Sequence, residues 1–209
     1  MAEVSGQDVH FSYETAGDGF PLVLVPGPQG VWSPYIPLLG ELCRTVVYTG
    51  HDLSETPSAK ELHPSARAAE MLGTFLELLG LERVYLASQA VSWHMALHFA
   101  LHCPERLEGL VLIGAHDVAT DVVCGIISLE GRLHEIPVPT LVVSEAETIA
   151  PYADLLTERL PHCTKLVVSD VTPAASSGIP ALQLEHAVMR FLLHCERQRN
   201  LVRGASFLL

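Results

Sequence analysis

The chain has 209 residues, 49% of them apolar and 17% charged, and its formal net charge is −12. A composition this apolar excludes a disordered chain, and the length predicts a single domain over residues 1–209. The 12 basic residues are outnumbered by 24 acidic residues. Because binding to a phosphate backbone needs a concentration of Lys and Arg side chains, we expect no nucleic-acid partner.

The first eight residues contain neither the basic nor the apolar region of a signal peptide. No apolar run reaches the roughly 20 residues that a membrane-spanning helix needs. The five cysteines are scattered and never in C-x-x-C spacing, which is typical of reduced thiols in a reducing compartment. We therefore expect a cytoplasmic protein with no membrane partner.

Short runs of β-branched residues alternate with helical patterns along the chain. This alternation predicts an α/β protein with a doubly wound, mostly parallel sheet. The expected strands are, in chain order, Val9–Tyr13, Leu22–Val25, Thr45–Tyr48, Val84–Ala87, Leu110–Ile113, Thr140–Ser144 and Lys165–Ser169. The expected helices are Pro34–Leu42, Pro64–Leu79, Ser92–His102, Tyr152–Leu160 and Ala181–Arg197.

Residues 86–100 read Leu-Ala-Ser-Gln-Ala-Val-Ser-Trp-His-Met-Ala-Leu-His-Phe-Ala. This segment resembles the nucleophile elbow of the α/β-hydrolase superfamily, in which a strand enters G-x-S-x-G and a helix follows. Three further segments are similar to superfamily motifs in the same order: Gly19–Gly27 to the oxyanion loop, Gly50–Pro57 to the loop after the fourth strand, and Ile136–Ser144 to the strand before the triad acid. The resemblance implies an α/β-hydrolase fold of the esterase or lactonase type.

Many members of this superfamily insert a lid domain between the sixth and seventh strands. Here the corresponding strands are Leu110–Ile113 and Thr140–Ser144, and only Ala115–Glu135 lies in the lid position between them, so we expect a fold without a lid domain. What is left of the lid is the apolar segment Val118–Ile127. Because exposed apolar patches usually mark interfaces, this segment predicts a homodimer contact or a protein partner, unless it folds down and fills the old pocket as core.

The resemblance places Ser88–Ser92 on the five elbow positions, so Ala90 stands where the superfamily has its nucleophilic serine. A methyl group cannot attack a carbonyl carbon. Two neighbouring serines, Ser88 and Ser92, are alternative nucleophiles. Each also fits as a small residue that the tight turn tolerates in place of glycine.

The other catalytic positions are altered as well. The histidine position after the last strand falls on Ala174, and the next histidine, His186, lies inside the last predicted helix. The acid position falls on Glu147, which can replace aspartate. Of the two oxyanion donors, Val91 keeps its N–H, but Pro28 has none. The catalytic triad is therefore degenerate, and more than one substitution separates this chain from an active hydrolase.

Polar residues still follow several of the predicted strands. His51 follows the predicted strand Thr45–Tyr48, and His116 with Asp117 follows the predicted strand Leu110–Ile113. A histidine beside a carboxylate can act as a general base, so a relocated acid–base site is an alternative interpretation. The candidate residues for a ligand pocket are Gly27, Pro28, Gln29, Trp32, His51, Gln89, Trp93, His116 and Asp117.

Large aromatic residues occur near the predicted pocket. Trp93 stands where the superfamily usually has a glycine, and its indole is large enough to fill space that the triad has left. Trp32 and Tyr35 follow the oxyanion loop and either line the same cavity or belong to the core. His94, His98 and His102 recur every four residues, but no H-E-x-x-H motif accompanies them, so we expect no metal and no cofactor.

The sequence thus favours a non-hydrolytic, pseudoenzyme-like member of the superfamily that binds a small apolar ligand or associates with a protein. Two alternatives stay open: an enzyme of the lyase or isomerase type with relocated acid–base residues, and a weak esterase that uses Ser88 or Ser92.

Overall fold

Within the described residues of the computed structural model, eight strands form one sheet in the order β1-β2-β4-β3-β5-β6-β7-β8. The structure describes residues 2–6, 9–26, 32–51, 64–89, 92–113, 129–145, 150–168 and 181–206. The strands are β1 (Ala2–Gly6), β2 (Val9–Ala16), β3 (Phe20–Val25), β4 (Cys43–His51), β5 (Val84–Gln89), β6 (Leu107–Ile113), β7 (Thr140–Glu145) and β8 (Cys163–Val168). The helices are α1 (Ile36–Leu39), α2 (Pro64–Leu78), α3 (Trp93–His102), α5 (Ala150–Arg159) and α6 (Ala181–Ser206), with 3-10 turns at Pro104–Arg106 and Glu130–Glu135.

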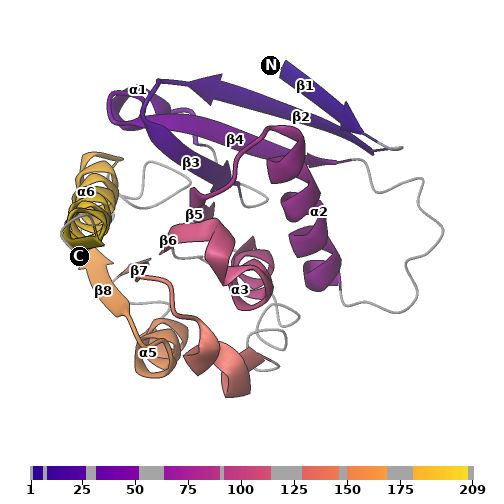
Figure 1. Ribbon diagram of the computed structural model, residues 1–209. Helices are drawn as coiled ribbons and strands as arrows, with labels where there is room; N and C mark the ends of the chain where they lie inside the picture. The colour runs from indigo at the N-terminus through magenta and orange to yellow at the C-terminus, as the bar shows by residue number, and fades with distance from the viewer. Residues whose placement is uncertain are drawn as a thin grey trace.

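The sheet is parallel from β4 to β8, and only β1 and β2 run antiparallel to their neighbours. Helices cover both faces, with α2, α3 and α5 on one side and α1 and α6 on the other (Figure 1). Each face has its own apolar core, and β5 is buried along its whole length. This arrangement confirms the predicted mostly parallel, doubly wound sheet.

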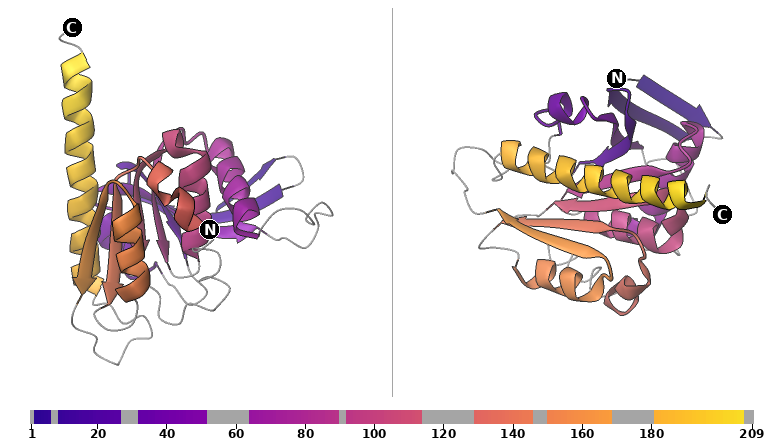
Figure 2. Two further views of the ribbon diagram at one scale, coloured as in Figure 1. Left: turned by 90° about the horizontal axis from the view of Figure 1, so that it is seen from below. Right: turned by 60° about the vertical axis from the view of Figure 1, so that its left-hand side comes forward.

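Every predicted strand and helix is present, although several bounds differ from expectation. The edge strand β1 was not predicted, because its sequence is polar and it forms by antiparallel pairing with β2. The helix α1 is shorter than the predicted Pro34–Leu42. The last helix, α6, continues to Ser206 rather than ending at Arg197. It extends well past the sheet at its C-terminal end (Figure 2).

The turn between β2 and β3 depends on a glycine. Gly17 has φ +78, and a Cβ atom there would lie 2.2 Å from the carbonyl oxygen of Cys43 and 2.3 Å from that of Gly40. No side chain fits this position, because the turn packs directly on the backbone that leads into β4.

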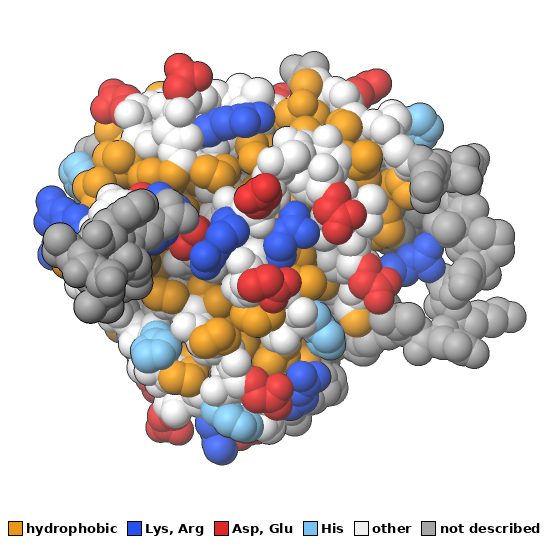
Figure 3. Space-filling model, in the orientation of Figure 1, with side chains coloured by type: hydrophobic (Ala, Val, Ile, Leu, Met, Phe, Trp, Pro, Cys, Tyr) orange, Lys and Arg blue, Asp and Glu red, His pale blue; other side chains and the backbone are white. Residues whose placement is uncertain are grey.

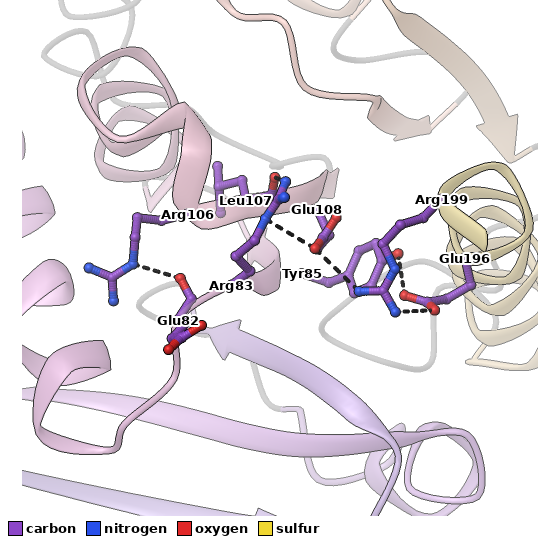
Figure 4. Close-up of polar contacts among 8 residues, drawn as sticks. All are labelled: Glu82, Arg83, Tyr85, Arg106, Leu107, Glu108, Glu196 and Arg199. Carbon is purple, nitrogen blue, oxygen red and sulfur yellow. Dashed lines mark hydrogen bonds and ion pairs between the residues drawn. The ribbon is translucent and has the colours of Figure 1, made fainter. Parts of the chain in front are cut away.

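A partly buried polar network fixes α6 against the amino ends of β5 and β6 (Figure 4). Glu108, whose side chain is 9% exposed, pairs with Arg83 at 3.0 Å and with Arg199 at 3.2 Å. Arg199 also pairs with Glu196 at 2.6 Å, and the hydroxyl of Tyr85 donates to Glu196 at 2.8 Å. Because α6 is anchored here by its C-terminal half, its N-terminal half lies toward the carboxyl ends of the strands.

Charged side chains of both signs are interspersed on the face shown in Figure 3, with hydrophobic side chains between them. Among the described helices, none is long and apolar enough to cross a membrane. The lid remnant Val118–Ile127 lies outside the described residues, so the absence of a lid domain stays a prediction.

Candidate functional site

Only residues 90–92 lie between β5 and α3, which are the strand and the helix that a nucleophile elbow would join. The strand β5 ends at Gln89 and α3 begins at Trp93, so Ala90 falls in the short connection between them. The strand lies between β3 and β6, and Ser88 is in register with Val25 and Leu112. Residues 90 and 91 themselves are not described. The elements on either side nevertheless place Ala90 directly after a central strand.

Of the two serines that lie two residues from Ala90, Ser88 is buried and Ser92 forms a hydrogen bond to the backbone. Ser88 is 0% exposed within the sheet, and its Oγ has no hydrogen-bond partner among the described residues. The hydroxyl of Ser92 donates to the backbone oxygen of Pro26 at 2.8 Å, which ties the start of α3 to the end of β3. A serine nucleophile must give its proton to a base. The hydroxyl of Ser92 is bonded to a carbonyl oxygen instead.

Trp93 is a core residue of the face covered by α2 and α3. It is 1% exposed, and its indole Nε1 donates to the backbone oxygen of Ile113 at 2.9 Å. The indole therefore satisfies the last carbonyl of β6, the strand next to β5. A glycine at this position could neither fill the core nor donate this side-chain hydrogen bond.

Trp32 and Tyr35 lie in the core on the other face of the sheet, with α1 and α6. Their ring centroids are 5.9 Å apart. Trp32 is 3% exposed, yet its Nε1 has no hydrogen-bond partner among the described residues. Trp32 and Tyr35 are thus buried in a different core cluster from Trp93.

The different surroundings of the two indoles give a testable difference in stability. Trp93→Phe and Trp32→Phe delete the same ring atoms, but only the first leaves a buried carbonyl oxygen without its donor. We expect Trp93→Phe to lower the free energy of unfolding by about 1–3 kcal/mol more than Trp32→Phe does. Urea denaturation of both variants measures the difference, and an equal or larger loss for Trp32→Phe would contradict this assignment.

Gln89, the last residue of β5, is also buried. It is 8% exposed, and its Oε1 has no hydrogen-bond partner among the described residues. Sequence reasoning named Gln89 as a pocket candidate from its place in the motif. It could not show that the amide oxygen is enclosed without a partner.

Most of the other predicted site residues lie outside the described ranges. His51 ends β4 and is in register with Phe11 of β2, but its side chain is not described. The remaining candidates outside the described residues are Gly27, Pro28, Gln29, Ala90, Val91, His116, Asp117, Glu147 and Ala174. Their roles stay predictions.

The three histidines of α3 do not share one environment. His94 is buried, His98 is half-buried and His102 is exposed, so the three imidazoles do not form one exposed cluster. The rings of His98 and His102 stack with centroids 6.0 Å apart, and the Nδ1 of His102 bonds to the backbone oxygen of His98 at 2.8 Å. Among the described residues, no group of three or more His, Cys, Asp or Glu side chains could hold a metal ion.

The C-terminal helix contributes one buried polar residue that sequence reasoning missed. His186 is exposed on α6, as its place in the helical pattern indicated, whereas the adjacent Glu185 is buried. The sequence pattern did not indicate that Glu185 is buried. A glutamate between Leu184 and His186 fits the polar face of an ordinary amphipathic helix.

Two buried cysteines among the described residues are unsuited to act as nucleophiles. Burial, reinforced by the charge of Glu196, raises the pKa of Cys43 to about 12 and that of Cys195 to about 11. The thiolate is the reactive form of cysteine, and at neutral pH these two side chains stay protonated.

Comparisons with known proteins agree with this architecture. No protein-family model matches the chain. A protein of Pantoea ananatis that carries the name "Putative carbamate hydrolase RutD" is 31% identical over 96 residues, which cover 44% of this chain and 34% of that protein. The chain spans less than half the length of the curated relatives that it matches first.

Solved structures match over most of the chain. The naproxen esterase of Bacillus subtilis has a TM-score of 0.71 at 16% identity, covering 91% of this chain and 90% of the esterase. An α/β-hydrolase enzyme from a Medee basin deep-sea metagenome library has a TM-score of 0.72 at 14% identity, covering 91% of this chain and 97% of the enzyme. The protein has the α/β-hydrolase fold, which confirms the resemblance in the sequence.

Proposed function

We propose that this α/β-hydrolase-fold protein is not a hydrolase of the acyl-enzyme type, and that it acts by binding a small, largely apolar molecule. The single observation that carries the proposal is the position of Ala90 between β5 and α3. In this fold that connection presents the nucleophile, and alanine has no group that can form an acyl-enzyme.

The neighbouring serines support the same conclusion. The side chain of Ser88 is enclosed in the sheet, and the hydroxyl of Ser92 is bonded to Pro26. Using either serine would require a change in the packing between β3, β5 and α3. The curated relatives are hydrolases, so this proposal places the chain among proteins that share their fold but have lost their chemistry.

Ester turnover tests the proposal. With p-nitrophenyl acetate, we expect no burst of p-nitrophenol in stopped-flow measurements and a steady rate no higher than that of the Ser88→Ala and Ser92→Ala variants. A burst that one of these variants abolishes would show a weak esterase instead. Turnover without a burst that both variants retain would favour relocated acid–base residues.

The proposal includes association through the apolar segment Val118–Ile127. If this segment is an interface, sedimentation velocity at two concentrations will show an oligomer, and Val122→Asp with Ile126→Asp will yield a folded monomer, because a buried carboxylate opposes the contact. A monomer at both concentrations, whose Asp variants unfold, would show that the segment belongs to the core.

A further inference from the structure

Two buried polar atoms lie without partners on the face of the sheet that α1 and α6 cover. They are the indole Nε1 of Trp32 and the amide Oε1 of Gln89, and neither has a hydrogen-bond partner among the described residues. Both side chains are more than nine-tenths buried. An indole N–H can only donate a hydrogen bond, and an amide oxygen can only accept one.

The register of the sheet places the two side chains on the same face. Gln89 pairs with Ile113, two residues along from the pair of Ala87 with Val111. Side chains alternate along a strand, so Gln89 faces the same way as Ala87. Ala87 and Ile113 belong to the core cluster that contains Trp32. Trp32 and Gln89 are therefore on one side of the sheet.

Gln89 also ends its strand, so its amide lies at the carboxyl edge of a parallel sheet. Ligands of open α/β sheets bind outside this edge. The groove that Glu77, Leu81 and Arg106 line, of about 440 Å³, includes the residues just before β5 and β6 and so lies at the opposite edge. It is separate from Trp32 and Gln89.

A buried donor or acceptor without a partner is costly, and such a group in a native protein is explained by strain, by a functional role, or by a water or ion that completes its hydrogen bond. One donor and one acceptor together are the complement of a carboxamide, whose carbonyl oxygen accepts and whose N–H donates. The core around Trp32 is otherwise apolar, with Tyr35 and Ile113 in the same cluster.

We propose that Trp32 and Gln89 form a polar recognition pair for a small apolar molecule that carries one carboxamide group. The carbonyl oxygen of the ligand accepts from Trp32 Nε1, and its N–H donates to Gln89 Oε1. This assignment rests on the proposed ligand-binding function and specifies the class of ligand that the site takes.

The chain has two tryptophans, so its indole N–H groups give two cross-peaks in a ¹⁵N–¹H correlation spectrum. The variants Trp32→Phe and Trp93→Phe assign them. Benzamide is the probe, and methyl benzoate is the matched control, because it has the same ring and carbonyl group but no N–H. The Trp93 cross-peak is the internal reference, since its indole is already bonded to Ile113.

We expect benzamide to shift the Trp32 cross-peak in a saturable manner and to leave the Trp93 cross-peak in place. Methyl benzoate should bind more weakly, by about tenfold, because it cannot donate to Gln89. In Gln89→Met this preference for the amide should disappear. If Gln89→Met fails to fold, Trp32→Phe carries the test, and its affinity for benzamide by saturation-transfer NMR should fall by a similar factor.

Three results would overturn the assignment. They are a Trp32 cross-peak that benzamide does not move up to its solubility limit, equal affinity for benzamide and methyl benzoate, and an unchanged preference in Gln89→Met. A Trp32 N–H in contact with water and insensitive to both probes would show an ordered water only. Release of benzoate in the same samples would contradict the non-hydrolytic function, while a shifted Trp32 cross-peak would still support the recognition pair.

Discussion

Replacing Phe75 with alanine is expected to lower the free energy of unfolding by about 3–5 kcal/mol, because the substitution opens a cavity in a packed core. Phe75 is fully buried on α2. Its ring centroid lies 5.0 Å from that of Tyr48, 5.4 Å from that of Phe11 and 5.7 Å from that of Tyr13. This cluster joins α2 to the antiparallel edge of the sheet.

Urea denaturation measures the loss. Leu201→Ala is a suitable control, because Leu201 is 68% exposed on α6 and its truncation should change stability by no more than about 0.5 kcal/mol. If Phe75→Ala changes stability no more than this control does, the packing of α2 on β2 and β4 is wrong.

The second large effect concerns catalysis. Ala90→Ser alone is expected to leave ester hydrolysis at the wild-type rate, because a serine hydroxyl needs a general base and the histidine position is Ala174. The triple variant Pro28→Phe, Ala90→Ser and Ala174→His restores the nucleophile, the base and an oxyanion donor. The triple variant should hydrolyse esters faster than Ala90→Ser does, and the added oxyanion donor alone should raise the rate by a factor of about 10²–10³.

Steady-state turnover of p-nitrophenyl esters compares these variants, with Ala90→Gly as the control that adds no hydroxyl. Turnover by Ala90→Ser well above that of Ala90→Gly would show that a base is already present. The assignment of the histidine position to Ala174 would then be incorrect.

The central sheet was predictable because its strands are continuous apolar runs. Such runs arise when both faces of a strand are buried, as they are along β5. The strand β1 has no such signal, since its residues alternate between half-buried and exposed and it depends on pairing with β2. The true end of α6 was also hidden, because the side chains of residues 198–201 are exposed or half-buried and so belong to no buried apolar face.

The assignment of Ala90 to the nucleophile position is a prediction from the sequence, because it depends only on the order of strand, motif and helix around Ala90. The contacts of residues on β5 and at the start of α3 could not be predicted from the sequence. The bond from Ser92 to Pro26 joins residues 66 positions apart, and that from Tyr85 to Glu196 joins residues 111 positions apart. Partners so distant follow from the folded arrangement of strands, for which a local motif carries no information.

Labelling with a fluorophosphonate tests the loss of the nucleophile most directly, because such reagents form a covalent adduct only with an activated serine. After prolonged incubation, we predict that the intact mass of the protein is unchanged, while a serine esterase in the same tube is fully modified. An adduct on the protein, located at Ser88 or Ser92 by peptide mapping, would contradict the account.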